Sequence, residues 1–268
     1  MPYLGHTYYE VQGEGPALLL LHGHTLDHRM WWEHVGPLAA RYRVITPDLD
    51  KHGRSGPSPD GTPLCQTLAA LLDHLGVGSA AVCGLSAGGA AAISFALNRP
   101  ERCAALIPVD TAIYGHPFRF WTGAMPYIKQ AQTEGLAPAL EAWVRDPIFQ
   151  RAAALPAMER LAAIVREYPG TDWLARPAYS PYPRGDRTEA ERLGEITAPT
   201  LVMVGEHDLP DFQIMADLVA SSVRGARKLV IAGAGHLSPI EQAEAFRQAL
   251  LAFLEEALRP YPEQTGGA

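Results

Sequence analysis

The stretch Val82-Cys83-Gly84-Leu85-Ser86-Ala87-Gly88-Gly89 joins an apolar run of strand length to a run of small residues with a helical pattern. It contains Gly-x-Ser-x-Gly, a pattern in which the serine sits on a sharp turn between a strand and a helix. Glycine at both ends suits such a turn, because a side chain there would crowd a strained backbone. The alternative is an ordinary glycine-rich loop, and the rest of the chain has to decide between them.

A serine hydroxyl is a weak nucleophile at neutral pH, so Ser86 needs a base and a pair of donors for the oxyanion that forms on a substrate. We predict that the backbone N–H of Ala87, at the start of the next helix, is one donor. The apolar run 17–21 leads into His22-Gly23-His24, and we predict the backbone N–H of His24 as the second donor. The side chains of His22 and His24 are left open between local hydrogen bonding and chemistry.

Strand and helix patterns alternate on both sides of Ser86. Apolar runs of strand length occupy residues 8–12, 17–21, 42–47, 79–83, 103–109, 200–204 and 228–231. Helical patterns follow most of them. Thr62-Pro63 is typical of a helix start, with Thr62 as the N-cap residue. Ser238-Pro239-Ile240-Glu241 is typical of a capping box, and it predicts a helix that runs to about Leu258. This alternation predicts an α/β fold with a mostly parallel central sheet and helices on both faces.

The alternation stops between residues 111 and 196, where prolines recur and only short helical patterns remain. We predict a core domain of residues 1–110 and 197–260, a helical cap inserted at 111–196, and a disordered tail at 261–268. The insertion is rich in aromatic residues, and we expect a minority of them to line an apolar substrate pocket. Our candidates for that pocket are Trp121 and Trp143.

Two further reactive residues follow predicted strands: Asp208 after the run 200–204, and His236 after the run 228–231. The carboxyl ends of parallel strands share one edge of a sheet, which brings both residues toward Ser86. His236 would accept the Ser86 proton, and Asp208 would fix the imidazole tautomer. Alternatively, Asp208 caps the helix that follows and His236 is an ordinary loop histidine.

The formal net charge of −7 gives no electrostatic argument for nucleic acid or an anionic membrane as a partner. The N-terminus has no secretory pattern, so we expect a cytoplasmic protein that binds a small-molecule substrate. Three scattered cysteines suggest neither disulfides nor a zinc site, and we predict no metal and no organic cofactor. The oligomeric state is left open.

With these residues in place, the chain resembles the α/β-hydrolase superfamily, in particular the branch of 3-oxoadipate enol-lactonase-like esterases and perhydrolases. The matching segments are His22-Gly23-His24, His52-Gly53-Arg54-Ser55, Gly84-Leu85-Ser86-Ala87-Gly88, Pro100-Glu101-Arg102, Gly205-Glu206-His207-Asp208 and Gly235-His236. The order nucleophile, acid, histidine also fits the superfamily. Glu141-Ala142-Trp143 is similar to a segment that often contributes to the pocket there. Asp50 and Lys51 depart from the arginine and glycine usual in that loop, which leaves the loop's backbone open.

The resemblance and the three residues together predict a serine hydrolase that cleaves a carboxylic ester or lactone of a small apolar or aromatic substrate through an acyl-enzyme on Ser86. Two alternatives use the same fold. One is hydrolysis of a C–C bond in a diketone, which the same three residues can perform. The other is a non-hydrolytic cyclase or ligand binder, which would not need an activated serine.

Overall fold

The computed structural model describes residues 2–58, 61–175 and 186–259. Its central sheet has the strand order β1-β2-β4-β3-β5-β6-β7-β8. The strands β1 and β2 are antiparallel to their neighbours, and β3 to β8 run parallel. They span Tyr3–Leu4 (β1), Thr7–Gln12 (β2), Ala17–Leu21 (β3), Arg43–Pro47 (β4), Ala80–Leu85 (β5), Cys103–Val109 (β6), Leu201–Gly205 (β7) and Arg227–Ile231 (β8).

Helices cover the sheet on both faces, as the strand and helix alternation predicts. The helix α2 packs on the small-residue helix α3, which lies against β5 and β6. The ring of Phe246 on α11 stacks on Trp31, at a centroid distance of 6.2 Å. The helices that flank the sheet are α1 (Val35–Ala39), α2 (Leu64–His74), α3 (Ala87–Asn98), α9 (Pro210–Ser222), α10 (Ser238–Glu241) and α11 (Ala243–Ala257).

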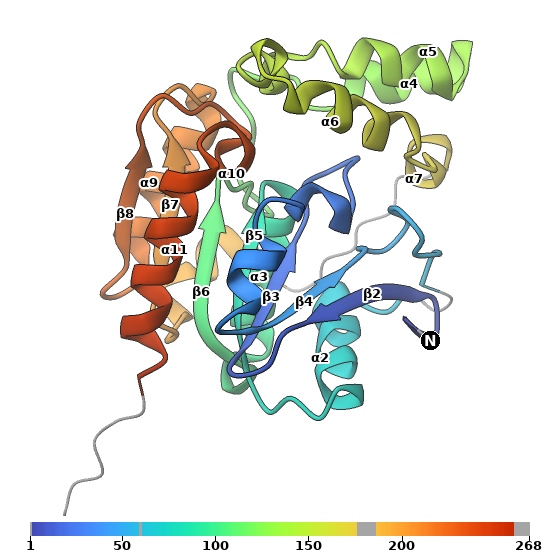
Figure 1. Ribbon diagram of the computed structural model, residues 1–268. Coiled ribbons are helices and arrows are strands. Elements are labelled where there is room, and N and C mark those ends of the chain that lie inside the picture. The colour runs from blue at the N-terminus through green and yellow to red at the C-terminus, as the bar shows by residue number, and fades with distance from the viewer. Residues whose placement is uncertain (1, 59–60, 176–185, 260–268) are drawn as a thin grey trace, which may run out of the picture.

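The described residues between β6 and β7 form helices and loops without a strand. The helices are α4 (Met125–Glu134), α5 (Leu136–Trp143), α6 (Ala157–Arg166), α7 (Thr171–Leu174) and α8 (Glu189–Arg192). Figure 1 shows α4 to α7, which belong to the predicted insertion at 111–196, grouped beyond the carboxyl ends of the strands. The division of the chain into core and cap stays a prediction, and the predicted tail at 261–268 lies outside the described residues.

Two indole N–H groups join this helical segment to the loop after β3. Trp143 donates to the hydroxyl of Thr25 over 2.7 Å, and Trp173 donates to Nε2 of His24 over 2.9 Å. Both indoles are buried. The helical segment is therefore held directly over the strand ends by polar as well as apolar contacts.

Two predicted helix starts are wrong in detail. Pro63, rather than Thr62, is the N-cap residue of α2. At the other position Leu237 is the N-cap, and the hydroxyl of Ser238 donates to the buried carboxylate of Asp110 over 2.5 Å, so Ser238 does not form a capping box. The backbone also leaves helical geometry at Gln242 (φ −136°, ψ 55°), which divides the predicted single helix into α10 and α11.

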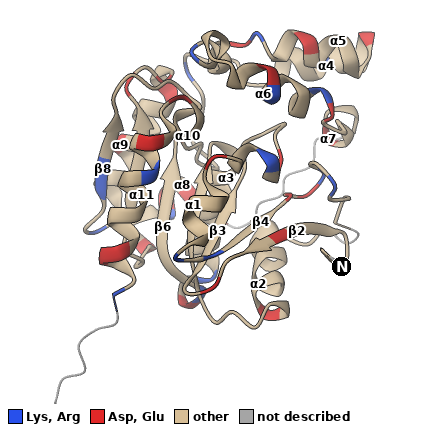
Figure 2. Cartoon of the chain, viewed as in Figure 1, with Lys and Arg blue, Asp and Glu red and all other residues tan. Residues whose placement is uncertain are grey.

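Charged positions of both signs are scattered over the ribbon in Figure 2, and α6 carries both acidic and basic residues. In the described part of the chain, no helix is long and apolar enough to cross a membrane.

Candidate active site

Ser86 lies between the end of β5 and the start of α3. Its backbone, with φ 55° and ψ −112°, has a conformation that residues other than glycine rarely adopt. The backbone holds it there, because its N–H donates to Val109 O over 2.9 Å and its carbonyl accepts from Ala90 N over 3.0 Å. A Cβ atom on Gly84 would collide with the carbonyl of Gly88. A Cβ atom on Gly88 would in turn collide with the carbonyls of Leu21 and His22. The turn therefore requires both glycines and turns Ser86 toward a cavity.

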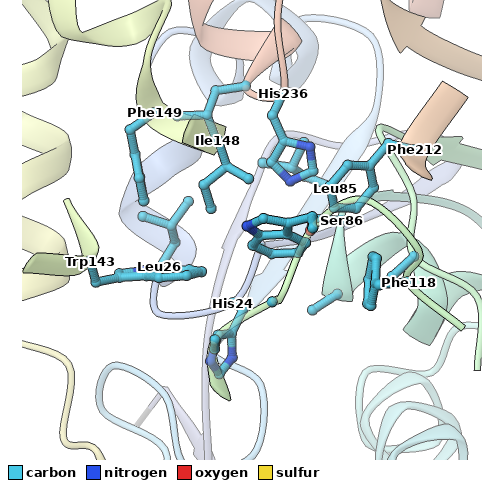
Figure 3. Close-up of a pocket in the computed structure, with 17 residues that line it drawn as sticks. His24, Leu26, Leu85, Ser86, Phe118, Trp143, Ile148, Phe149, Phe212 and His236 are labelled. Carbon is cyan, nitrogen blue, oxygen red and sulfur yellow. The ribbon is translucent and has the colours of Figure 1, made fainter. Parts of the chain in front are cut away.

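Asp208 and His236 meet at the carboxyl ends of β7 and β8. Nδ1 of His236 lies 3.1 Å from each carboxylate oxygen of Asp208. Both residues are buried. A proton on Nδ1 donated to Asp208 leaves Nε2 as the basic nitrogen, and His236 and Ser86 line the same cavity (Figure 3).

Asp208 does not cap the helix that follows it, the alternative role left open by the sequence, because Leu209 is the N-cap residue of α9. Oδ1 of Asp208 accepts the backbone N–H of Leu209 over 2.7 Å, just before α9 begins. This bond joins neighbouring residues and helps to hold the carboxylate that faces His236.

Asp110 is a buried carboxylate beside this pair that sequence reasoning missed. It follows β6 with a left-handed φ of 44° and accepts from Gly205 N over 2.7 Å and from Ser238 Oγ over 2.5 Å. Burial raises its pKa well above the usual value, and the charge of Asp208 raises it further. Asp110 thus joins the end of β7 to the segment that follows His236. Its position directly after a buried strand was the only signal in the sequence.

The two predicted oxyanion donors line the same cavity as Ser86. Ala87 is the first residue of α3, where the positive end of the helix dipole faces the cavity. The ring of His24 points away from Ser86 and His236 in Figure 3 and accepts its bond from Trp173 instead. Burial lowers the pKa of His24 to about 4, so the ring is neutral at physiological pH.

The cavity has a volume of about 240 Å³ and an almost wholly apolar wall. Both predicted pocket residues, Trp121 and Trp143, contribute to it. The described residues that line it are Gly23, His24, Leu26, Leu85, Ser86, Ala87, Ala112, Phe118, Trp121, Gly123, Ala124, Trp143, Ile148, Phe149, Phe212, His236 and Leu237. Other aromatic residues of the helical segment, such as Tyr168 and Trp173, pack beside His24 and do not line the cavity.

The loop after β4 accommodates both unusual residues. Lys51 adopts the left-handed φ of 65° that favours glycine. Oδ1 of Asp50 accepts the N–H of Ser58 over 2.5 Å, so this carboxylate supports the loop from within.

Asp27, His28 and Asp48 lie close enough to share a metal ion, a grouping that the sequence analysis did not predict. Their polar atoms already bond within the protein. Asp48 Oδ1 lies 2.6 Å from His28 Nδ1, and its Oδ2 accepts Arg54 N over 2.8 Å. The side chain of Asp27 binds Arg29. The group is therefore explained as an internal hydrogen-bond network.

Comparison with known proteins decides the family. A family model described as the alpha/beta hydrolase fold matches residues 16–243. This chain belongs to the α/β-hydrolase family. The predicted fold class and the predicted resemblance are thereby confirmed, and 3-oxoadipate enol-lactonase 2 of Acinetobacter baylyi is among the relatives, 27% identical over 261 residues.

Other proteins similar to this α/β-hydrolase are named as an acetyltransferase component and as esterases. The chain is 31% identical over 259 residues to the dihydrolipoyllysine-residue acetyltransferase component of the acetoin cleaving system of Pseudomonas putida, covering 93% of this chain and only 66% of that relative. It is 28% identical to carboxylesterase YbfK of Bacillus subtilis, covering 93% and 84% of the two chains. A solved thermophilic esterase from Thermogutta terrifontis superimposes with a TM-score of 0.80 at 29% identity, covering 94% of this chain and 93% of that one.

Proposed function

We propose that this α/β-hydrolase is a serine hydrolase that cleaves a carboxylic ester or lactone of a small, uncharged apolar or aromatic molecule. The observation that carries the proposal is the Asp208–His236 pair opening onto the same apolar cavity as the strained Ser86. Relatives and structural neighbours named as carboxylesterases and lactonases support it.

In the acylation step, Nε2 of His236 takes the proton from Ser86 Oγ while Oγ attacks the ester carbonyl carbon. The oxyanion that forms accepts hydrogen bonds from the backbone N–H groups of His24 and Ala87. When the C–O bond breaks, His236 returns the proton to the leaving alkoxide. Asp208 stabilises the imidazolium throughout.

In the deacylation step, water enters the cavity, loses a proton to His236 and attacks the acyl-enzyme. Ser86 leaves and recovers its proton from His236. The scheme uses residues of this chain for every proton transfer.

The test is release of p-nitrophenol from a series of p-nitrophenyl acyl esters of increasing chain length. We expect turnover that falls by about a thousandfold or more in Ser86→Ala. A matched control is Ser221→Ala, because Ser221 is exposed on α9 and bonds only to carbonyls of its own helix. Full activity in Ser86→Ala would overturn the proposal, whereas an inactive wild type would favour the C–C hydrolase or the non-hydrolytic cyclase.

A further inference from the structure

Two buried carboxylates lie behind the cavity wall formed by Trp121. Asp211, on the first turn of α9, accepts the backbone N–H groups of Arg119, Phe120 and Trp121 over 2.8, 2.9 and 2.8 Å. Asp146 accepts the indole N–H of Trp121 over 3.1 Å. Backbone and side chain of this wall residue are therefore held by separate carboxylates.

In the described part of the chain, every hydrogen-bond partner of these two carboxylates is a neutral donor. Asp146 also accepts from the hydroxyl of Tyr127 over 2.8 Å and from Ile148 N over 3.0 Å. Asp146 is 3% exposed and Asp211 is 1% exposed. Despite its burial, three backbone N–H groups and, more weakly, the nearby His116 lower the pKa of Asp211, which keeps it ionised at neutral pH. The wall thus has negative charge behind it that water screens poorly.

The cavity itself offers nothing to pair with an anion. Of the described residues that line it, none is lysine or arginine. His24 is neutral and its ring points away, and His236 is paired with Asp208. A substrate carboxylate entering this space would lose its hydration without gaining a cation.

We propose that the cavity selects uncharged acyl groups over carboxylate-bearing ones, and that Asp146 is a specificity-determining residue that strengthens this selection. The inference rests on the proposed esterase function and adds the charge of the substrate to it. An alkyl or aryl ester fits the apolar wall, and a half-ester of a dicarboxylic acid, or a lactone with a free carboxylate, is rejected. Asp146 acts through the field behind Trp121 and touches no substrate atom.

The experiment compares two esters with the same leaving group and similar acyl length: p-nitrophenyl butyrate, which is neutral, and mono-p-nitrophenyl succinate, which carries a carboxylate. The enzyme-free rate of each ester is measured separately and subtracted, because the succinate ester also releases p-nitrophenol by attack of its own carboxylate. We then expect kcat/KM of the wild type to favour the neutral ester by about a hundredfold or more. A ratio within about fivefold of unity would overturn the inference.

The matched variants are Asp146→Asn and Glu159→Gln, which each remove one negative charge. The amide in Asp146→Asn retains a hydrogen-bond acceptor for Trp121, whereas Glu159 is an exposed residue of the first turn of α6. We expect Asp146→Asn to lower the neutral-to-anionic ratio by about fivefold or more and Glu159→Gln to leave it unchanged. Equal effects of both variants would overturn the role of Asp146.

The wild-type ratio decides the charge selection even if Asp146→Asn does not fold. The two esters also distinguish a failure of this inference from a failure of the proposed function. Turnover of both esters at similar rates refutes only the charge selection. Turnover of neither refutes the esterase and, with it, the inference that depends on it.

Discussion

His22 is fully buried, and both nitrogens of its neutral ring have hydrogen-bond partners. Nδ1 lies 2.9 Å from Gly23 O, and Nε2 accepts the N–H of Leu49 over 2.8 Å. Burial, with a smaller effect from His52, lowers the pKa of His22 from 6.5 to about 4. The sequence left the role of the His22 side chain open, and the structure shows that it links the loops after β3 and β4.

This lowered pKa predicts how stability depends on pH. As the pH falls, the unfolded chain binds a proton at His22 at a higher pH than the folded protein does. The stability that neutral His22 contributes is therefore complete above pH 6.5 and is lost as the pH falls through about 4. Between about pH 7 and about pH 5, we expect His22 to account for a fall of about 2 kcal/mol in the free energy of unfolding. Urea denaturation at the two pH values measures this fall.

The control compares two histidine variants. His22→Gln should show a smaller fall between the two pH values than the wild type, because glutamine does not titrate. His207→Gln should keep the wild-type fall, since the ring of His207 is about half exposed (47%). An identical fall in wild type and His22→Gln would show that His22 is not responsible.

Among single residues, the sequence pointed to the proposed catalytic residues more readily than to the residues that support them. Ser86, Asp208 and His236 each follow a predicted strand, so a pattern could find them. Asp110 and Ser238 are 128 positions apart and meet only after folding. That contact also explains why Ser238 misled the prediction, because a buried carboxylate competes for its hydroxyl with the helix terminus.

Among the elements, the turn from β5 to α3 leaves no room for side chains at its two glycines, Gly84 and Gly88. A methyl group on Gly88 would collide with two carbonyl groups of the β3 end. We expect Gly88→Ala to lower the free energy of unfolding by about 3 kcal/mol and to reduce activity, because the backbone must move at Ser86. Thermal or urea denaturation and ester turnover measure the two effects.

Gly78→Ala is the matched control for this turn. Gly78 has no neighbouring atom within 4 Å of an added Cβ atom. We expect the stability of this variant to change by no more than about 0.5 kcal/mol. Equal stability of the two variants would mean that the tight approach of α3 to β3 is not needed.

The elements themselves were largely predictable from periodicity. The predicted strand at 103–109 agrees with β6, and the small-residue helical pattern after Ser86 corresponds to α3. Short β1 carries too few residues to show a period, and the break between α10 and α11 depends on one backbone conformation at Gln242. Neither leaves a pattern in the sequence.

For the whole molecule, strand and helix alternation predicted a parallel sheet, but not which strands are neighbours. The cavity is still harder to predict from the sequence, because it forms where residues of the helical segment between β6 and β7 meet residues that follow the strands of the sheet, far away in the chain. Composition indicated an aromatic cap, and only the fold distinguishes Trp121 and Trp143, which line the cavity, from Tyr168 and Trp173, which pack beside His24.

We propose that the fold makes Ser86 an activated nucleophile. The most direct measurement is covalent labelling by a serine-directed fluorophosphonate, read as an intact-protein mass and located by peptide mapping. We predict an adduct on the Ser86 peptide that is absent from Ser86→Ala and forms about a hundredfold or more slowly in His236→Ala. An unlabelled wild type, or equal labelling of Ser86→Ala, would contradict the claim.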